Sequence, residues 1–130
     1  AGGDTSGDVF IWNLNTYQLI TTLSEGYDVV TGLDWTPDDS ELLIGYSMTG
    51  AVVRNIESGA IRLEIPIGAT FGASFSPDGD KILMAPWTGI GMWDTANGEN
   101  LLLFFKMGYR HRQPRNSSTI QNRNRRRGCR

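Results

Sequence analysis

The feature that most restricts the fold of this chain is a sequence repeat with a period of about 40 residues. An aromatic residue followed by a Pro-Asp turn occurs at Trp35–Asp39 and again, 40 positions later, at Phe75–Gly79. Each copy is followed by an apolar run, a small-residue turn (Thr49-Gly50 and Thr88-Gly89) and a second apolar run. Such self-similarity is typical of proteins that stack copies of one supersecondary unit.

A third anchor repeats with nearly the same period. Trp12–Thr16, Arg54–Ser58 and Trp93–Asn97 align with offsets of 42 and 39 residues. Three anchors in register therefore define one repeating unit.

The segments between the turns are short and rich in β-branched and aromatic residues, and Gly, Pro, Asn and Asp bound them, which is typical of strands and hairpins. We expect an all-β chain with ten strands, at residues 8–13, 17–23, 29–35, 41–46, 51–55, 60–65, 70–75, 81–85, 90–94 and 99–105. Four strands per repeat predict the antiparallel blades of a β-propeller, of which the chain would hold about two and a half.

The charge distribution divides the chain in two. Residues 1–105 carry all fourteen acidic residues and three basic ones, a formal charge of −11, whereas residues 106–130 carry nine basic residues and no acidic one. A segment so charged and so poor in apolar residues cannot bury enough surface to offset its ordering entropy. We expect propeller blades over 1–105 and a disordered Arg-rich tail over 106–130.

The repeat motifs resemble those of the WD-repeat family. The resemblance rests on the turn at Phe75–Gly79, its variant at Trp35–Asp39, and the Trp-Asp ending at Trp93-Asp94 with its variant Trp12-Asn13. It covers residues 1–105 and implies a β-propeller that presents a partner-binding surface on its top face, as a scaffold in a larger assembly.

The sequence also departs from that family. The Gly-His dipeptide before the first strand of a blade is replaced by Gly26-Tyr27 and Pro66-Ile67, and Arg54 stands where a Trp is expected. The family's Asp-His-Ser-Trp hydrogen-bonded tetrad is therefore not expected here. Two other propeller groups share features with the chain: the periplasmic translocation propellers, through the Ser-Pro-Asp-Gly turn, and more loosely the propeller subunits of histone methyltransferase complexes, through Pro66 and Pro86.

No constellation of residues predicts catalysis. His111 is the only histidine and Cys129 the only cysteine, and both lie in the basic tail, away from any partner that could orient them. Gly89-Ile90-Gly91 lacks the third glycine and the following helix of a dinucleotide fingerprint. We expect no enzymatic activity and no cofactor.

Four carboxylates in the repeated turns are candidate metal ligands: Asp38, Asp39, Asp78 and Asp80. They fall in two turns one repeat apart and lack the spacing of a calcium loop. Asp and Pro are also the residues that turns prefer. We interpret them as turn residues and expect no metal site.

Two aromatic residues are the candidates for contact with a partner protein. Trp87 follows Pro86 at the end of an expected strand, where an amphipathic ring can remain on the rim, and Tyr46 stands at the corresponding place one repeat earlier. We expect Trp12, Phe75 and Trp93 to fill the core instead.

The basic tail provides a second candidate site. Its arginines Arg123, Arg125, Arg126 and Arg127 could neutralise phosphates or act as a nuclear-import signal. Two alternatives stay open, an inert extension and a segment that is not a native continuation of the repeat.

These observations predict a protein-interaction scaffold, with other proteins as partners. The alternatives are a chromatin- or nucleic-acid-associated propeller that uses the tail, and the propeller portion of an enzyme whose active site lies elsewhere. Residues 1–8 lack the features of a secretory signal, and the apolar runs are far shorter than the ~20 residues of a membrane-spanning helix. We therefore expect an intracellular protein, cytoplasmic or nuclear, with no membrane partner. We also expect the chain to be a fragment of a larger propeller, or to complete one by association.

Overall fold

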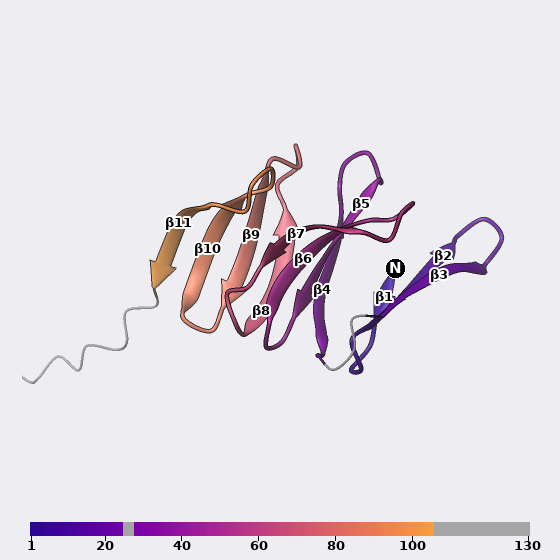
Figure 1. Ribbon diagram of the computed structural model, residues 1–130, viewed down its shortest axis with the longest axis horizontal. Coiled ribbons are helices and arrows are strands. Elements are labelled where there is room, and N and C mark those ends of the chain that lie inside the picture. The colour runs from indigo at the N-terminus through magenta and orange to yellow at the C-terminus, as the bar shows by residue number, and fades with distance from the viewer. Residues whose placement is uncertain (25–27, 106–130) are drawn as a thin grey trace, which may run out of the picture.

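A computed structural model describes residues 1–24 and 28–105, which form eleven strands in three antiparallel sheets (Figure 1). The first sheet contains β1 (Gly2–Gly3), β2 (Asp8–Asn13) and β3 (Gln18–Ser24). The second contains β4 (Val30–Trp35), β5 (Glu41–Tyr46), β6 (Gly50–Asn55) and β7 (Ile61–Ile65). The third contains β8 (Thr70–Phe75), β9 (Lys81–Pro86), β10 (Gly89–Asp94) and β11 (Asn100–Phe105).

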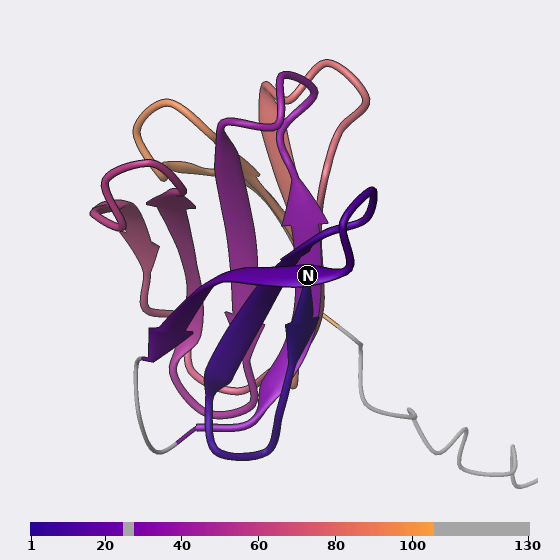
Figure 2. The same cartoon turned by 90° about the vertical axis from the view of Figure 1, so that its right-hand side faces the viewer.

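Each sheet is a meander in which consecutive strands are hydrogen-bonded neighbours. The sheets follow one another along the long axis of the molecule, and the view turned by 90° shows them one behind the other (Figure 2). Strand β8 of the third sheet packs against β4 and β5 of the second. The described residues are therefore all-β and contain no helix, so none of them forms a helix that could cross a membrane.

The repeated turns between the first two strands of a sheet are held by carboxylates. The Asp38 carboxylate accepts hydrogen bonds from the Ser40 hydroxyl at 2.7 Å, the Thr36 hydroxyl at 2.8 Å and the Ser40 N–H at 3.1 Å. These bonds, that of the Ser40 hydroxyl first, lower the pKa of Asp38 to about 2. In the next repeat Asp78 accepts from the Ser76 hydroxyl and the Asp80 N–H. The interpretation of both acids as turn residues is confirmed.

Two apolar layers hold the three sheets together. The layer between the first and second sheets contains Val9, Ile11, Leu23, Leu42, Ile44 and Tyr46. The layer between the second and third contains Leu43, Ala51, Val53, Ile65, Ile82, Met84 and Trp93. The middle sheet contributes to both layers from alternate residues of the same strands, since successive side chains of a strand point to opposite faces. Its strand β5 is accordingly buried along nearly its whole length.

In the apolar layer between the second and third sheets, one side chain packs closely against a glycine. The Trp93 ring lies over Gly91, where an added Cβ would come within 2.3 Å of a ring carbon. At the edge of the same interface Arg62 pairs with Glu41 of its own sheet and donates to the Thr95 carbonyl of the third sheet at 2.9 Å. The second and third sheets are thus joined by packing and by polar contacts.

All ten predicted strands are present, with bounds that differ by at most one residue. The structure adds β1, whose two glycines gave no strand pattern. The expectation that Trp12 fills the core is wrong, because its side chain is 43% exposed on the outer side of the first sheet, whereas Trp93 is 4% exposed. The expected tail, 106–130, lies outside the described residues.

Candidate partner-binding surface

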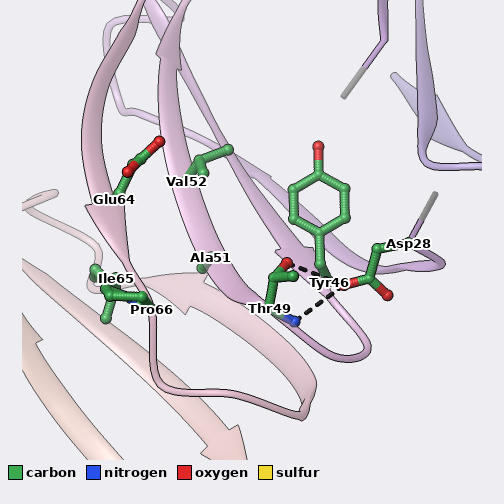
Figure 3. Close-up of a pocket in the computed structure, with 8 residues that line it drawn as sticks. All are labelled: Asp28, Tyr46, Thr49, Ala51, Val52, Glu64, Ile65 and Pro66. Atoms are coloured by element: carbon green, nitrogen blue, oxygen red, sulfur yellow. Dashed lines mark hydrogen bonds between the residues drawn. The ribbon is translucent and has the colours of Figure 1, made fainter. Parts of the chain in front are cut away.

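One end of the second sheet is organised by Asp28, the residue two positions before β4. Its carboxylate accepts hydrogen bonds from the Ser47 hydroxyl at 2.5 Å and the Met48 N–H at 3.0 Å. It also accepts from the Thr49 hydroxyl at 2.9 Å and the Thr49 N–H at 3.0 Å (Figure 3). Desolvation raises the pKa of Asp28, but these hydrogen bonds together outweigh it and lower the pKa. Asp28 therefore fixes the turn between β5 and β6.

A recess of about 260 Å³ lies beside this turn. Eight residues line it: Asp28, Tyr46, Thr49, Ala51, Val52, Glu64, Ile65 and Pro66 (Figure 3). Its two carboxylates differ in their surroundings, since Asp28 is tied to the turn and Glu64 is exposed on β7. The described residues include no group of three or more His, Cys, Asp or Glu side chains that could hold a metal ion.

The two predicted contact residues, Tyr46 and Trp87, differ in how far their side chains are exposed. The Tyr46 side chain is 4% exposed and belongs to the layer between the first and second sheets, so it offers little surface to a partner. In the sheet register Tyr46 pairs with Val30 as Pro86 pairs with Thr70. The counterpart of Tyr46 is therefore Pro86, and Trp87 stands one residue beyond it.

Trp87 lies in the turn between β9 and β10 and its side chain is 75% exposed. Its N–H donates to the Ala69 carbonyl at 3.0 Å, and its ring centroid lies 5.6 Å from that of Phe71, with the ring planes inclined by 39°. The backbone at this exposed ring is thus held in place. Whether a partner contacts Trp87 or Tyr46 stays a prediction.

Trp87 belongs to a larger apolar patch that the sequence pattern did not reveal. A shallow groove beside it is lined by Phe71, Ala85, Pro86, Trp87, Gly89, Ile90, Phe104 and Phe105. We call the four exposed aromatic residues of this groove, Phe71, Trp87, Phe104 and Phe105, the aromatic rim patch; their side chains are 62–75% exposed. The sequence signal for this patch is the apolar pair Phe104-Phe105 at the end of an expected strand. The pair alone does not show which residues lie beside it in the folded sheet.

The remaining predicted site residues are Arg123, Arg125, Arg126 and Arg127, together with the weighed residues His111 and Cys129. All of them lie outside the described residues. A role in phosphate binding or nuclear import stays a prediction, and a salt-dependent affinity for DNA that is lost on deletion of 106–130 would support it.

Comparison with known proteins identifies the architecture. The chain superposes with a TM-score of 0.68 on the β-propeller domain of Cps50 (Swd1) from Myceliophteria thermophila, at 20% sequence identity, over 76% of this chain and 33% of that one. It superposes equally well on hydrazine synthase from Kuenenia stuttgartiensis, at 21% identity, over 77% of this chain and 30% of that one. The three sheets thus have the arrangement of β-propeller blades.

At the level of sequence, no known protein family has a model that matches the chain. A curated relative, a protein from Sulfurisphaera tokodaii described as a putative Tricorn-like protease C-terminal subunit, is 29% identical over 76 residues. That match covers 55% of this chain and 9% of the relative. The chain therefore spans under a tenth of this relative and about a third of each structural neighbour.

Proposed function

We propose that this chain is a protein-binding propeller module of the WD-repeat type, which docks a partner protein on the aromatic rim patch. The observation that carries the proposal is the gathering of four exposed aromatic side chains around one groove of the third sheet. Contiguous exposed apolar surface of this kind marks interaction sites in soluble proteins.

The chemistry of the patch suits a protein partner. Aromatic residues are over-represented among the side chains that dominate binding energy, because each buries a large area with few rotatable bonds. Trp87 is further prepared for binding, since its backbone is hydrogen-bonded to Ala69 and its ring already contacts Phe71. Binding therefore requires little additional ordering of the patch.

The assignment to the WD-repeat type rests on the repeated motifs and their register. Trp12, Arg54 and Trp93 occupy equivalent places in β2, β6 and β10, each at a register shift opposite the outermost strand. The Asp38 and Asp78 turns occupy equivalent places as well. These equivalent positions support the WD-repeat type, and the scaffold role is what the resemblance to that family implies.

The proposal is tested by affinity capture from the native host with three forms of the protein. Trp87→Ala combined with Phe71→Ala removes the centre of the patch, while Tyr17→Ala removes an 86% exposed ring from the distant β2–β3 hairpin and serves as the control. The proposal predicts a protein that the wild type and Tyr17→Ala retain in a fixed ratio and the double variant loses. A partner retained equally by all three forms would contradict it.

A second candidate is the propeller portion of an enzyme, which the match to the protease-subunit relative favours. The described residues would then supply structure, and the catalytic groups would come from elsewhere. The same capture distinguishes the two functions. A hydrolase that co-purifies with the chain in a fixed ratio supports the enzyme portion, and stoichiometric partners without enzymatic activity contradict it.

A further inference from the structure

The recess beside the β5–β6 turn combines an apolar lining with negative charge. Alanine, valine, isoleucine, proline and tyrosine residues line most of it, whereas Asp28 and Glu64 stand on opposite sides (Figure 3). Glu64 and Thr49 are exposed, so the recess opens at the surface. It belongs to the middle sheet, which packs against both other sheets, and it shares no residue with the aromatic rim patch.

The negative charge of the recess is not neutralised within the described part of the chain. The Asp28 carboxylate is bound by hydroxyl and N–H groups, which carry no charge, and its lowered pKa keeps it ionised. Glu64 forms no ion pair with any described residue. A third carboxylate, that of Asp4, is also bound by N–H groups alone. It lies at the same end of the second sheet, because the Asp4 carbonyl accepts the Val30 N–H at 3.1 Å.

The basic side chains of the second and third sheets lie at the opposite end. Arg54 pairs with Leu42 near the start of β5, Arg62 stands near the start of β7, and Lys81 begins β9. No other arginine or lysine occurs among the described residues. The recess instead lies where β5 ends and β6 begins. Its end of the sheet therefore has carboxylates and no basic side chain from the described chain.

The size and lining of the recess suit a single basic side chain. Sites for small molecules measure roughly 300–1,000 Å³, whereas this recess measures about 260 Å³. Long basic side chains place an apolar stem against apolar surface and keep the charged group at its edge. A guanidinium is planar with N–H donors on several edges, so it can meet carboxylates on two sides, while an ammonium is a compact point charge. Among the described groups Oδ1 of Asp28 accepts only from the Ser47 hydroxyl, so it retains acceptor capacity for such a donor.

We propose that this recess receives an arginine side chain of a partner protein, with the guanidinium between Asp28 and Glu64 and the stem against Val52. The charge complementarity follows from the recess itself, and the claim that the arginine belongs to a protein rests on the proposed function.

The recess and the aromatic rim patch lie at the same end of the molecule. Pro66 lines the recess, and three residues later the Ala69 carbonyl accepts the Trp87 N–H. One short connection between β7 and β8 thus joins the two surfaces. A partner segment that carries an arginine beside its apolar residues would contact both.

Titration of the full chain with a short peptide, followed by nuclear magnetic resonance, tests the recess alone. The probes are capped glycyl-arginyl-glycine and the same peptide with citrulline, a neutral isostere of arginine. The proposal predicts saturable shifts of the Thr49 and Glu64 backbone amides with the arginine peptide and none with the citrulline peptide. Equal shifts with both peptides would overturn it, because charge would then play no part. The absence of saturable shifts with the arginine peptide would overturn it as well.

A charge reversal locates the site. Glu64→Lys is expected to weaken binding of the arginine peptide about tenfold or more, because two like charges would then meet. Glu57→Lys is the matched control, since it changes the net charge equally at an exposed turn at the opposite end of the sheet and should leave the affinity unchanged. An equal loss with both variants would indicate a general charge effect and overturn the site. Circular dichroism confirms that each variant keeps its β structure.

The double variant Trp87→Ala, Phe71→Ala separates this proposal from the proposed function. It should lose the partner protein in the capture experiment and keep the peptide-induced shifts at Thr49 and Glu64. Loss of those shifts in the double variant would overturn a separate site in the recess. In the capture experiment Glu64→Lys should retain less of the partner than Glu57→Lys does. Equal retention would overturn the claim that the arginine belongs to that protein and would leave the role of the aromatic rim patch intact.

Discussion

The carboxylate of Asp34 accepts a hydrogen bond from the backbone N–H of Phe75 at 2.7 Å. The two residues lie 41 positions apart, on β4 and β8, so one side chain joins the first strands of the second and third sheets. A partly buried carboxylate that accepts from a backbone N–H forms a charge-assisted bond, which is stronger than a neutral one.

Asp34→Ala is therefore expected to lower the free energy of unfolding by about 1–3 kcal/mol, because it leaves the Phe75 N–H without its acceptor. Asp34→Asn should lower it less, since an amide oxygen can still accept. Ser74→Ala, at the same repeat position on the exposed side of β8, is the control. Urea titrations followed by circular dichroism measure all three, and an unchanged midpoint for Asp34→Ala would show that the bond does not stabilise the interface.

The turn held by Asp28 should make stability depend on pH. The pKa of Asp28 is lowered from 3.8 in the folded protein. Its stabilising effect is then fully present above 3.8 and is lost as the pH falls through the folded pKa. The difference in melting temperature between the wild type and Asp28→Asn should be constant from pH 7 to pH 5 and should shrink below pH 4. A difference that persists unchanged at pH 2 would contradict this account.

Gly91 provides a test of the packing between the second and third sheets. Gly91→Ala places a Cβ against the Trp93 ring and is expected to cost about 1–3 kcal/mol, because a close-packed layer must shift to accept it. Gly72→Ala is the matched control, since a Cβ there meets no atom within 4 Å. Equal unfolding midpoints for the two variants would contradict the described packing.

Replacing either tryptophan of the third sheet by alanine should change the free energy of unfolding to very different extents. Trp93 is 4% exposed and Trp87 is 75% exposed. Trp93→Ala is expected to cost about 3–5 kcal/mol through the cavity that it leaves. Trp87→Ala should cost less than about 1 kcal/mol, as surface substitutions generally do. Chemical unfolding measures both, and a large loss at Trp87 would indicate a packing role in place of a binding role.

The sequence was sufficient to predict the strands because two local signals agree throughout the repeat. Turn residues such as Pro77 and Asp78 mark the ends, and β-branched or aromatic runs mark the strands between them. Strand β1 was not predicted because its two residues are both glycine and show neither signal. The prediction that Trp12 is buried is wrong. The repeat predicts which face of the sheet a residue belongs to, but burial also requires that another sheet cover that face.

The candidate surface was less predictable. The place of Trp87 after Pro86 predicts an exposed ring, and the ring is 75% exposed. The same expectation of exposure is wrong for Tyr46, which pairs with Val30 and lies inside the layer between the first and second sheets. Phe71 joins Trp87 from another strand, a contact that no local pattern encodes. The roles of Asp28 and Asp34 likewise depend on partners 19–41 residues away, which only the folded arrangement brings together.

The most direct test of the account is whether the repeat stacks its sheets as propeller blades in solution. Nuclear Overhauser contacts of the Trp93 ring protons report this, because Trp93 belongs to the third sheet whereas Leu43 and Val53 of the same layer belong to the second. The account predicts contacts from the Trp93 ring to methyl groups of that layer in the second sheet. A Trp93 ring with contacts only to residues of β8–β11 would show that the sheets do not stack as described.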